Sequence, residues 1–235
     1  MRAMILAAGL GTRMRPLTND CPKPLLPVAG KPMIEYQIER LADIGVEQLV
    51  INVSYRAEQI EQALGDGGRW GLCIHYSHEP EALETAGGII QALEWLDDGE
   101  DGPFLLLNGD VWCDLPLDRL PKQFDGKGLL LLVDNPEHNP NGDFVVQQGR
   151  VVEPTDSSWS RLTFAGISRL RPSLFEGLVP GKRALGPLLH QAAAEGNLAA
   201  QYYPGYWLDV GTPERLQRLD HRLRTTTDKQ DGTGE

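Results

Sequence analysis

The hydrophobic positions of the first 134 residues follow two periods in turn, and this pattern predicts strands that alternate with helices. Helical spacing is clearest over residues 33–45, where Ile34, Ile38, Leu41 and Ile44 recur along one face. Short, nearly continuous apolar runs are typical of buried strands; they occupy residues 2–8, 47–53, 71–77, 102–111 and 128–134. Further helices are expected over 57–67 and 85–96. The alternation indicates an α/β fold, a Rossmann-like doubly wound mixed sheet with helices on both faces (three layers, α/β/α).

The regular alternation of strands and helices ends after residue 134. Residues 143–154 are typical of a hairpin that turns near Gly149, and residues 162–170 of a further strand. Two helices are expected over 183–196 and 212–224, separated by residues 198–211. We therefore expect a single domain, 1–224, in which residues 135–224 cover the carboxyl edge of the sheet. The polar tail, 225–235, is expected to be disordered.

Charge and cysteine content narrow the class of protein. A formal net charge of −11 argues against general binding to nucleic acid or to anionic membranes, because neither would attract an acidic protein. No apolar run approaches the ~20 residues that span a bilayer. The three cysteines have no CxxC spacing and no even count. These features predict a cytoplasmic, soluble protein.

The loop after the first strand departs from this acidic balance. Residues 7–32 read AAGLGTRMRPLTNDCPKPLLPVAGKP, and residues 1–31 contain five Lys or Arg and one acid. Gly9 and Gly11 let a backbone approach a ligand closely, and Arg13 and Lys23 suit phosphate oxygens. The dinucleotide fingerprint fails because Met14 stands where a third glycine is needed. A phosphate-bearing ligand is expected here; a turn with solvated charges is the alternative.

Several motifs together resemble a known family. GLGTRMRPLT (9–18), PKP (22–24) and GKPMIEY (30–36) are similar to the opening signature of the sugar-1-phosphate nucleotidylyltransferases. LETAGGI (83–89), LNGDVW (107–112), FAGI (164–167) and WLDVGTPERL (207–216) follow in the family's order. These enzymes condense a nucleoside triphosphate with a sugar 1-phosphate, giving a nucleotide sugar and pyrophosphate. The resemblance implies that residues 1–134 bind the nucleotide and residues 135–224 bind the sugar.

The resemblance also implies roles for residues that carry charge. The opening loop would wrap the triphosphate through Gly9, Gly11, Thr12 and Arg13; Arg13 would hold the departing pyrophosphate, and Lys23 would act on the reacting phosphates. Both are the expected catalytic residues. Two anionic phosphates must approach each other, so catalysis consists mainly of positioning and charge neutralisation, with no side-chain nucleophile.

Asp110 and Asp209 correspond to the family's metal-binding aspartates. Mg²⁺, with Mn²⁺ as a substitute, is the expected cofactor, because Mg²⁺ prefers one or two carboxylates together with phosphate oxygens. Asp110 ends an apolar strand and Asp209 stands between Leu208 and Val210. The alternatives are a turn or helix-capping aspartate for the first and a buried structural acid for the second.

Base recognition is expected from the backbone and from one acid. The residues expected to bind the nucleotide, besides the opening loop, are Leu6, Ala7, Ala8, Glu79, Thr85 and Asn108. Glu79 stands where some relatives have glutamine, and a carboxylate only accepts hydrogen bonds. It suits N3–H of uracil or thymine, or N1–H and N2–H₂ of guanine. An exposed loop glutamate is the alternative.

The residues that contact the sugar are the hardest to assign from the sequence. Glu84 replaces the glycine that most relatives carry before Thr85. Glu153 stands at about the place of the family's E-K-P motif, but proline follows it directly and the lysine of the motif is missing. These departures, in a short chain, most resemble the N-acetylmuramate-1-phosphate uridylyltransferases of bacterial cell-wall recycling, which use UTP. Residues 139–143, NPNGD, are typical of a turn, and turn formation explains this composition as well as contact with a sugar does. The candidates for the sugar pocket are Asn141, Gly142, Asp143, Glu153 and Gly166.

Two other functions remain open. A mannose-1-phosphate guanylyltransferase would also use Glu79, and a non-catalytic nucleotide-sugar sensor is possible within the family. Retention of Arg13, Lys23, Asp110 and Asp209 together argues against the sensor. The expected partners are a nucleoside triphosphate and a sugar 1-phosphate, with no nucleic acid and no membrane. A monomer or a small homo-oligomer is expected.

Overall fold

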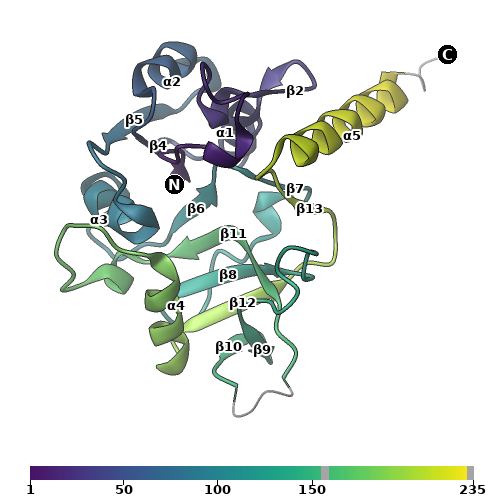
Figure 1. Cartoon of the computed structure of the whole chain (residues 1–235). Coiled ribbons are helices and arrows are strands. Elements are labelled where there is room, and N and C mark those ends of the chain that lie inside the picture. The colour runs from purple at the N-terminus through teal and green to yellow at the C-terminus, as the bar shows by residue number, and fades with distance from the viewer. Residues whose placement is uncertain (155–158, 232–235) are drawn as a thin grey trace.

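A computed structural model describes residues 1–154 and 159–231, with side chains through residue 226. Within this part of the chain one mixed sheet dominates, in the order β5-β4-β1-β6-β11-β8-β12-β10-β9 (Figure 1). Its strands are β1 (Arg2–Leu6), β4 (Gln48–Val53), β5 (Cys73–His78), β6 (Phe104–Asn108), β8 (Gly128–Val133), β9 (Val145–Gln147), β10 (Arg150–Val152), β11 (Thr163–Leu170) and β12 (Leu198–Tyr202). Two small ribbons pair β2 (Pro27–Val28) with β3 (Lys31–Pro32), and β7 (Val111–Cys113) with β13 (Trp207–Asp209).

The direction of the strands changes at β11, which lies between β6 and β8. β5, β4, β1 and β6 are parallel, whereas β11 is antiparallel to both of its neighbours, β6 and β8. β12 is parallel to β8, and the β9–β10 hairpin, expected to turn near Gly149, closes that edge of the sheet. The predicted doubly wound, mixed α/β fold is confirmed.

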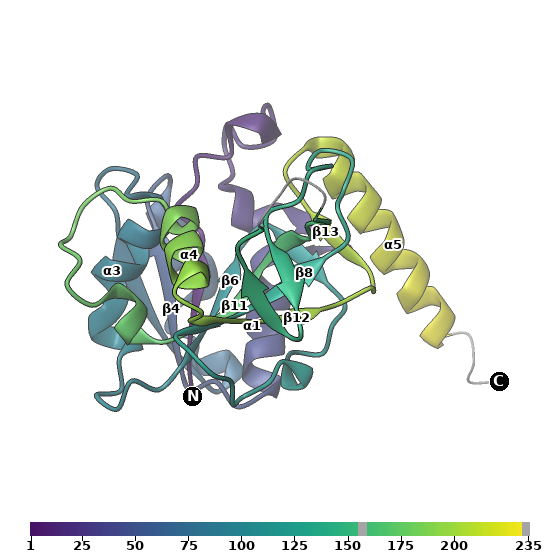
Figure 2. The same cartoon turned by 90° about the horizontal axis from the view of Figure 1, so that it is seen from below.

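Helices cover both faces of the sheet because side chains along each strand alternate between two cores. On one face, α1 (Met33–Asp43) and α2 (Ala57–Leu64) pack with Ile5, Leu49 and Leu107. On the other, α3 (Glu84–Leu96) and α4 (Leu185–Ala194) pack with Met4, Val50 and Leu130. Figure 2 shows α3 and α4 together on their side of the sheet. Among the described residues no helix has the length and apolar character to cross a membrane.

A third core holds the opening loop against the C-terminal helix. Met14, Val28 and Met33 pack with Val210 and with Leu219 of α5 (Pro213–Asp231). This contact brings residues near the two ends of the sequence together at one side of the sheet. Beyond it, α5 leaves the body of the protein (Figures 1 and 2).

Two boundaries differ from the sequence-based expectation. The predicted strand over residues 102–111 ends at Asn108, and the chain bends at Gly109–Asp110 before β7. Helix α5 runs to Asp231, beyond residue 224, where the predicted helix ends; residues 232–235 lie outside the described part. An Asp220–Arg224 pair and the hydroxyls of Thr225 and Thr226, which donate to carbonyls one turn earlier, support the helix. No glycine or proline interrupts it before Gly232.

Candidate active site

A cavity of about 280 Å³ lies at the carboxyl edge of the parallel strands. Leu6, the last residue of β1, pairs in register with Asn52 of β4 on one side and with Asn108 of β6 on the other. Ligands of open α/β sheets bind at this edge, where strand ends place backbone groups and loop residues around a crevice. The residues that line the cavity include Leu6, Ala7, Ala8, Gly9, Lys23, Asn52, Glu79, Glu84, Thr85, Asn108 and Asp110.

One end of this cavity is closed by a buried network of polar side chains. Asn52 accepts a hydrogen bond from the Ala7 N–H (2.7 Å) and donates one to Glu79 Oε1 (2.7 Å). Glu79 Oε2 accepts from the Leu83 N–H (3.0 Å), and Glu79 is only 4% exposed. A Cβ on Gly88 would lie 2.4 Å from Glu79 Oε1, so this glycine of α3 lets the carboxylate fit. Glu79 is therefore a buried, fixed acceptor, not an exposed loop glutamate.

The other end of the cavity carries a lysine–aspartate ion pair. Lys23 begins the 3₁₀ turn Lys23–Leu25, and its Nζ lies 2.6 Å from Asp110 Oδ2. The lysine side chain is 10% exposed and the aspartate side chain 35%. A cation buried to this degree needs a charged partner, and here the partner lies at the bend between β6 and β7. The pair presents one positive and one negative group to the same cavity.

Asp209 lies beside Asp110 because β13 pairs with β7. The Val210 N–H donates to the Asp110 carbonyl (2.7 Å), and Asp209 pairs in register with Val111. Asp209 Oδ2 accepts from Arg215 Nη1 (2.7 Å) and lies 3.3 Å from His138 Nε2. Asp209 Oδ1 is buried with no hydrogen-bond partner among the described residues.

Arg13 lies next to Asp209. The Arg13 guanidinium nitrogens lie 3.3 Å from the point that a Cβ on Gly211 would occupy, and Asp209 Oδ1 lies 2.9 Å from the same point. The fold thus gathers two cations of the opening loop and two aspartates into one cluster: Arg13 and Lys23 come from residues 12–25, Asp110 from the middle of the chain, and Asp209 from its last strand.

The two aspartates fit a divalent cation. Asp209 Oδ1 is an orphaned, buried carboxylate oxygen, which a cation would satisfy. The described residues contain no group of three or more His, Cys, Asp or Glu side chains that could hold a metal. Two carboxylates suit Mg²⁺ in particular, because this ion keeps water and phosphate oxygens as its remaining ligands.

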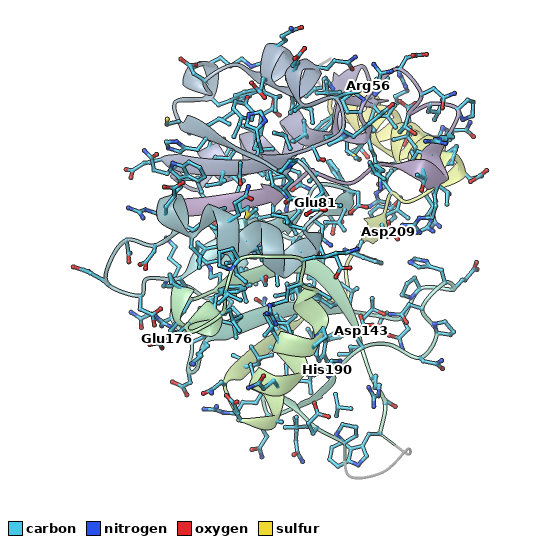
Figure 3. The ribbon with its side chains drawn as sticks, turned by 60° about the vertical axis from the view of Figure 1, so that its left-hand side comes forward. Arg56, Glu81, Asp143, Glu176, His190 and Asp209 are labelled. Carbon is cyan, nitrogen blue, oxygen red and sulfur yellow. The ribbon has the colours of Figure 1, made fainter. Side chains whose placement is uncertain are left out.

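A second, larger cavity of about 540 Å³ adjoins the first. Glu84, Thr85 and Asn108 line both cavities. The remaining residues come from the second half of the chain: Asp143, Phe144, Phe164, Ala184, Leu185, Gly186, Leu189 and His190. Figure 3 shows Asp143 and His190 on the same side of the molecule, beside α4. Two ligands bound in the two cavities would therefore both lie beside these three shared residues.

Asp143 is fixed at the second cavity by hydrogen bonds to both of its oxygens. Oδ1 accepts from Asn139 Nδ2 (3.0 Å) and Oδ2 from the Phe164 N–H (2.8 Å). His190 Nδ1 lies 3.5 Å from Glu153 Oε1, and the His190 ring packs against the ring of Phe144. The cavity therefore combines aromatic walls with hydrogen-bonding groups, as sugar-sized ligands require.

The structure places the predicted site residues in three groups. Those that line the first cavity are Leu6, Ala7, Ala8, Gly9, Lys23, Glu79, Thr85, Asn108 and Asp110. Arg13 and Asp209 lie in the adjoining charged cluster, while Gly11 and Thr12 belong to the turn that precedes it. Of the sugar candidates, Asp143 lines the second cavity, whereas Asn141, Gly142, Glu153 and Gly166 are not among its lining residues.

Three of these sugar candidates support the cavity without lining it. Glu153 contacts the cavity residue His190. Gly166 has φ +71°, and a Cβ there would lie 2.5 Å from Asn108 Nδ2. The glycine is needed so that Asn108 can stand between the two cavities. Gly142, at φ +61°, turns the loop that carries Asp143.

Asn52, His190 and Arg215 are among the residues of the site that the sequence analysis did not predict. Asn52 left a signal, because a polar residue interrupts the apolar run of β4 one residue before the strand ends, as Asn108 ends β6. His190 and Arg215 left none, since each lies on an exposed-looking stretch of a helix. Their roles depend on contacts between segments far apart in the sequence.

Burial raises the pKa of the Cys113 thiol, as is typical of a core cysteine.

Comparison with known proteins agrees with this geometry. The sequence signature of the family described as "Nucleotidyl transferase" matches residues 2–152, more than half of the chain. An N-acetylmuramate alpha-1-phosphate uridylyltransferase from Neisseria meningitidis serogroup B (strain ATCC BAA-335 / MC58) is 46% identical over 226 residues, which cover 92% of this chain and 96% of that protein. The catalytic subunit beta of mannose-1-phosphate guanylyltransferase from Dictyostelium discoideum is 35% identical over 224 residues and is matched over 62% of its length.

Solved structures share the fold. A Bacillus anthracis protein crystallised with sucrose superposes with a TM-score of 0.81 at 22% identity, covering 95% of this chain and 96% of that one. HddC from Yersinia pseudotuberculosis, complexed with GMP-PN, gives 0.76 at 24% identity, covering 94% and 99%.

The fold and the family signature define a nucleotidyltransferase with an α/β sheet. More particularly, the chain belongs to the sugar-1-phosphate nucleotidyltransferases, as the resemblance of its motifs implied.

Proposed function

We propose that this protein transfers the uridylyl group of UTP to N-acetylmuramate 1-phosphate and releases pyrophosphate. The observation that carries the proposal is the pair of adjoining cavities, one with Glu79 and the Lys23–Asp110 pair, the other sugar-sized, with three shared residues between them. The relative that is 46% identical over nearly its whole length bears the name of this activity. A place in the recycling of bacterial cell-wall sugars, and a cytoplasmic location, belong to the same proposal.

The reaction needs charge neutralisation more than chemistry from the protein. A phosphate oxygen of the sugar 1-phosphate attacks the α-phosphorus of UTP, and the bond to the β-phosphate oxygen breaks in line, so that pyrophosphate leaves. Lys23, held at the edge of the first cavity, reduces the repulsion between the two reacting phosphates. Arg13, beside Asp209, is placed to hold the pyrophosphate that departs.

A magnesium ion is part of the proposal. Asp110 and Asp209 would hold it, and when bound it supplies positive charge to the triphosphate oxygens. Arg215 keeps Asp209 in place through one hydrogen bond to its carboxylate and one to its carbonyl. Lys23 neutralises Asp110 from the other side.

Uracil would be read at the closed end of the first cavity. Glu79 can accept a hydrogen bond from the N3–H of the base, because a carboxylate oxygen accepts more than the one bond that each already makes. Leu6, Ala7 and Ala8 line the same cavity, beside the Ala7 N–H that donates to Asn52.

A mannose-1-phosphate guanylyltransferase is the second candidate. Glu79 would accept from N1–H and N2–H₂ of guanine equally well, and relatives of that name are 35% identical. The higher identity and the nearly complete coverage of the muramyl relative favour the uridylyltransferase.

The test is product identification. N-acetylmuramate 1-phosphate is incubated with Mg²⁺ and, in separate reactions, with UTP, dTTP, GTP, ATP or CTP, and the nucleotide sugar is identified by mass spectrometry. We expect product with UTP, little with dTTP, and none with Asp110→Asn, whose fold is checked by circular dichroism. Absence of a nucleotide sugar from the UTP reaction, with a folded protein, would refute the proposal.

A further inference from the structure

Glu84 has a backbone conformation that its side chain disfavours. It is the first residue of α3, with φ +60°, in the left-handed region that glycine adopts without penalty. Residues held in such conformations cluster at functional sites, because the surrounding structure must force them to persist. The unusual backbone of Glu84 is therefore a reason to look for a function of its side chain.

The surroundings of Glu84 hold it firmly. The Arg183 carbonyl accepts hydrogen bonds from the Ala86 and Gly87 N–H groups (3.0 and 3.1 Å), and the Arg183 N–H donates to the Leu83 carbonyl (2.9 Å). This loop, which leads into α4, thereby fixes the first turn of α3. Lys182 Nζ lies 3.6 Å from Glu84 Oε1. The segment before α4 thus fixes the backbone from which the Glu84 side chain extends, and this side chain is itself 45% exposed.

The location of Glu84 is as specific as its backbone. It lines both cavities, so it stands where a nucleotide in one meets a sugar phosphate in the other. The substrates are anionic, and a carboxylate at this place repels them unless it accepts a hydrogen bond from one of them. A lysine partner that is 66% exposed does little to offset this repulsion.

The chemistry of a sugar 1-phosphate indicates which donor is available. The anomeric carbon, which carries the phosphate, must lie nearest the first cavity. Its ring neighbours are the ring oxygen and carbon 2. The ring oxygen only accepts hydrogen bonds and would be repelled by a carboxylate, whereas carbon 2 carries a hydroxyl or an acetamido N–H, both donors.

We infer that Glu84 is a specificity-determining residue that accepts a hydrogen bond from the donor on carbon 2 of the sugar 1-phosphate. The inference rests on the proposed function for the identity of the sugar, whose carbon 2 bears an acetamido group. Residue 84 then selects sugar phosphates that have a donor at this position against those that lack one. The left-handed backbone is what directs the carboxylate to the junction of the cavities.

The test compares two substrates and two glycine variants. The substrates are N-acetylmuramate 1-phosphate and its 2-azido analogue, which lacks the N–H, each with UTP and Mg²⁺. Glu84→Gly removes the carboxylate and relieves the backbone. Gln148→Gly is the matched control, because Gln148 is also left-handed (φ +51°), is exposed, and lies in the β9–β10 turn away from both cavities. The measured quantity is the ratio of kcat/KM between the two substrates.

In the wild type and in Gln148→Gly we expect this ratio to favour the acetamido sugar by about 10- to 100-fold, the range for a hydrogen bond to a charged group. Glu84→Gly should reduce the ratio to within about threefold of one, while both glycine variants raise Tm by about 1–4 °C because each relieves a left-handed residue. A ratio in Glu84→Gly that equals the wild-type ratio would overturn the inference. If the wild type uses neither substrate, the proposed function itself fails, and the two failures are distinct.

Discussion

Replacing Asp110 with asparagine separates the two roles of this carboxylate, metal binding and pairing with Lys23. The substitution keeps the side-chain shape and removes one negative charge. Lys23, whose side chain is 10% exposed, then keeps a neutral acceptor at 2.6 Å in place of a charged one. Breaking a fully buried pair costs about 3–5 kcal/mol and breaking an exposed pair about 0–1 kcal/mol.

Asp110 is 35% exposed, so the expected loss of stability lies between these limits, at about 1–3 kcal/mol. For a chain of 235 residues this corresponds to a fall in Tm of about 2–10 °C. Turnover should fall by at least about 10²–10³, because the carboxylate that would hold the metal, and with it the positive charge on the reacting phosphates, is lost. Lys23→Met should lower Tm less than Asp110→Asn does, because water can hydrate Asp110 once the lysine is gone.

The assay combines pyrophosphate release at saturating Mg²⁺ with thermal unfolding. Asp118→Asn serves as the control, because it makes the same chemical change at an exposed residue of a 3₁₀ turn away from the cavities. It should leave both turnover and Tm close to those of the wild type. An Asp110→Asn enzyme that retains turnover within about threefold of the wild type would show that Asp110 is a structural aspartate and would refute the metal assignment.

Further predictions concern the other charged residues. Asp209→Asn should reduce turnover as strongly as Asp110→Asn, and retained turnover at saturating Mg²⁺ would assign Asp209 to structure alone. Arg13→Ala should slow pyrophosphate release by about 10²–10³ without a change in Tm, because the side chain is exposed; an effect below about threefold would mean that Arg13 does not contact the leaving group. Chelation should abolish activity, and Mg²⁺ or Mn²⁺ should restore it; activity that persists in chelator would contradict a metal mechanism. Glu79→Gln should retain UTP binding through its carbonyl, whereas Glu79→Ala should weaken it by about tenfold or more, measured by calorimetry; equal binding by both variants would remove Glu79 from base recognition.

The strands and their order of alternation with helices could be predicted because apolar runs record burial directly. Leu6, Asn52 and Asn108 illustrate the limit. Leu6 and Asn108 are the last residues of their strands and Asn52 is the last but one of β4, and their meeting at one edge follows from parallel pairing. The hydrogen bond between Asn52 and Glu79 joins residues 27 positions apart and depends on how α3 packs, which no local pattern records.

The charged cluster was found by resemblance and not by pattern. Asp209 reaches Asp110 through the β7–β13 ribbon, and nothing near either residue predicts that pairing. Arg215 is a similar case, since its contact with Asp209 depends on where α5 begins. Of the residues predicted for the sugar, Asp143 lines the second cavity, which we propose as the sugar pocket, whereas Glu153 and Gly166 do not. Residues of α4 such as Leu189 and His190 line it as well, and no motif in the sequence points to them.

The measurement that tests the account most directly is the ratio of kcat/KM for two substrate pairs in the same buffer with Mg²⁺. One pair is UTP with N-acetylmuramate 1-phosphate, and the other is GTP with mannose 1-phosphate. We expect the first pair to be preferred by at least about 100-fold, because both the base and the sugar differ and each mismatch leaves polar groups of the site unpaired. Faster turnover of the second pair would contradict the assignment of substrate, and turnover of neither would contradict the assignment of function.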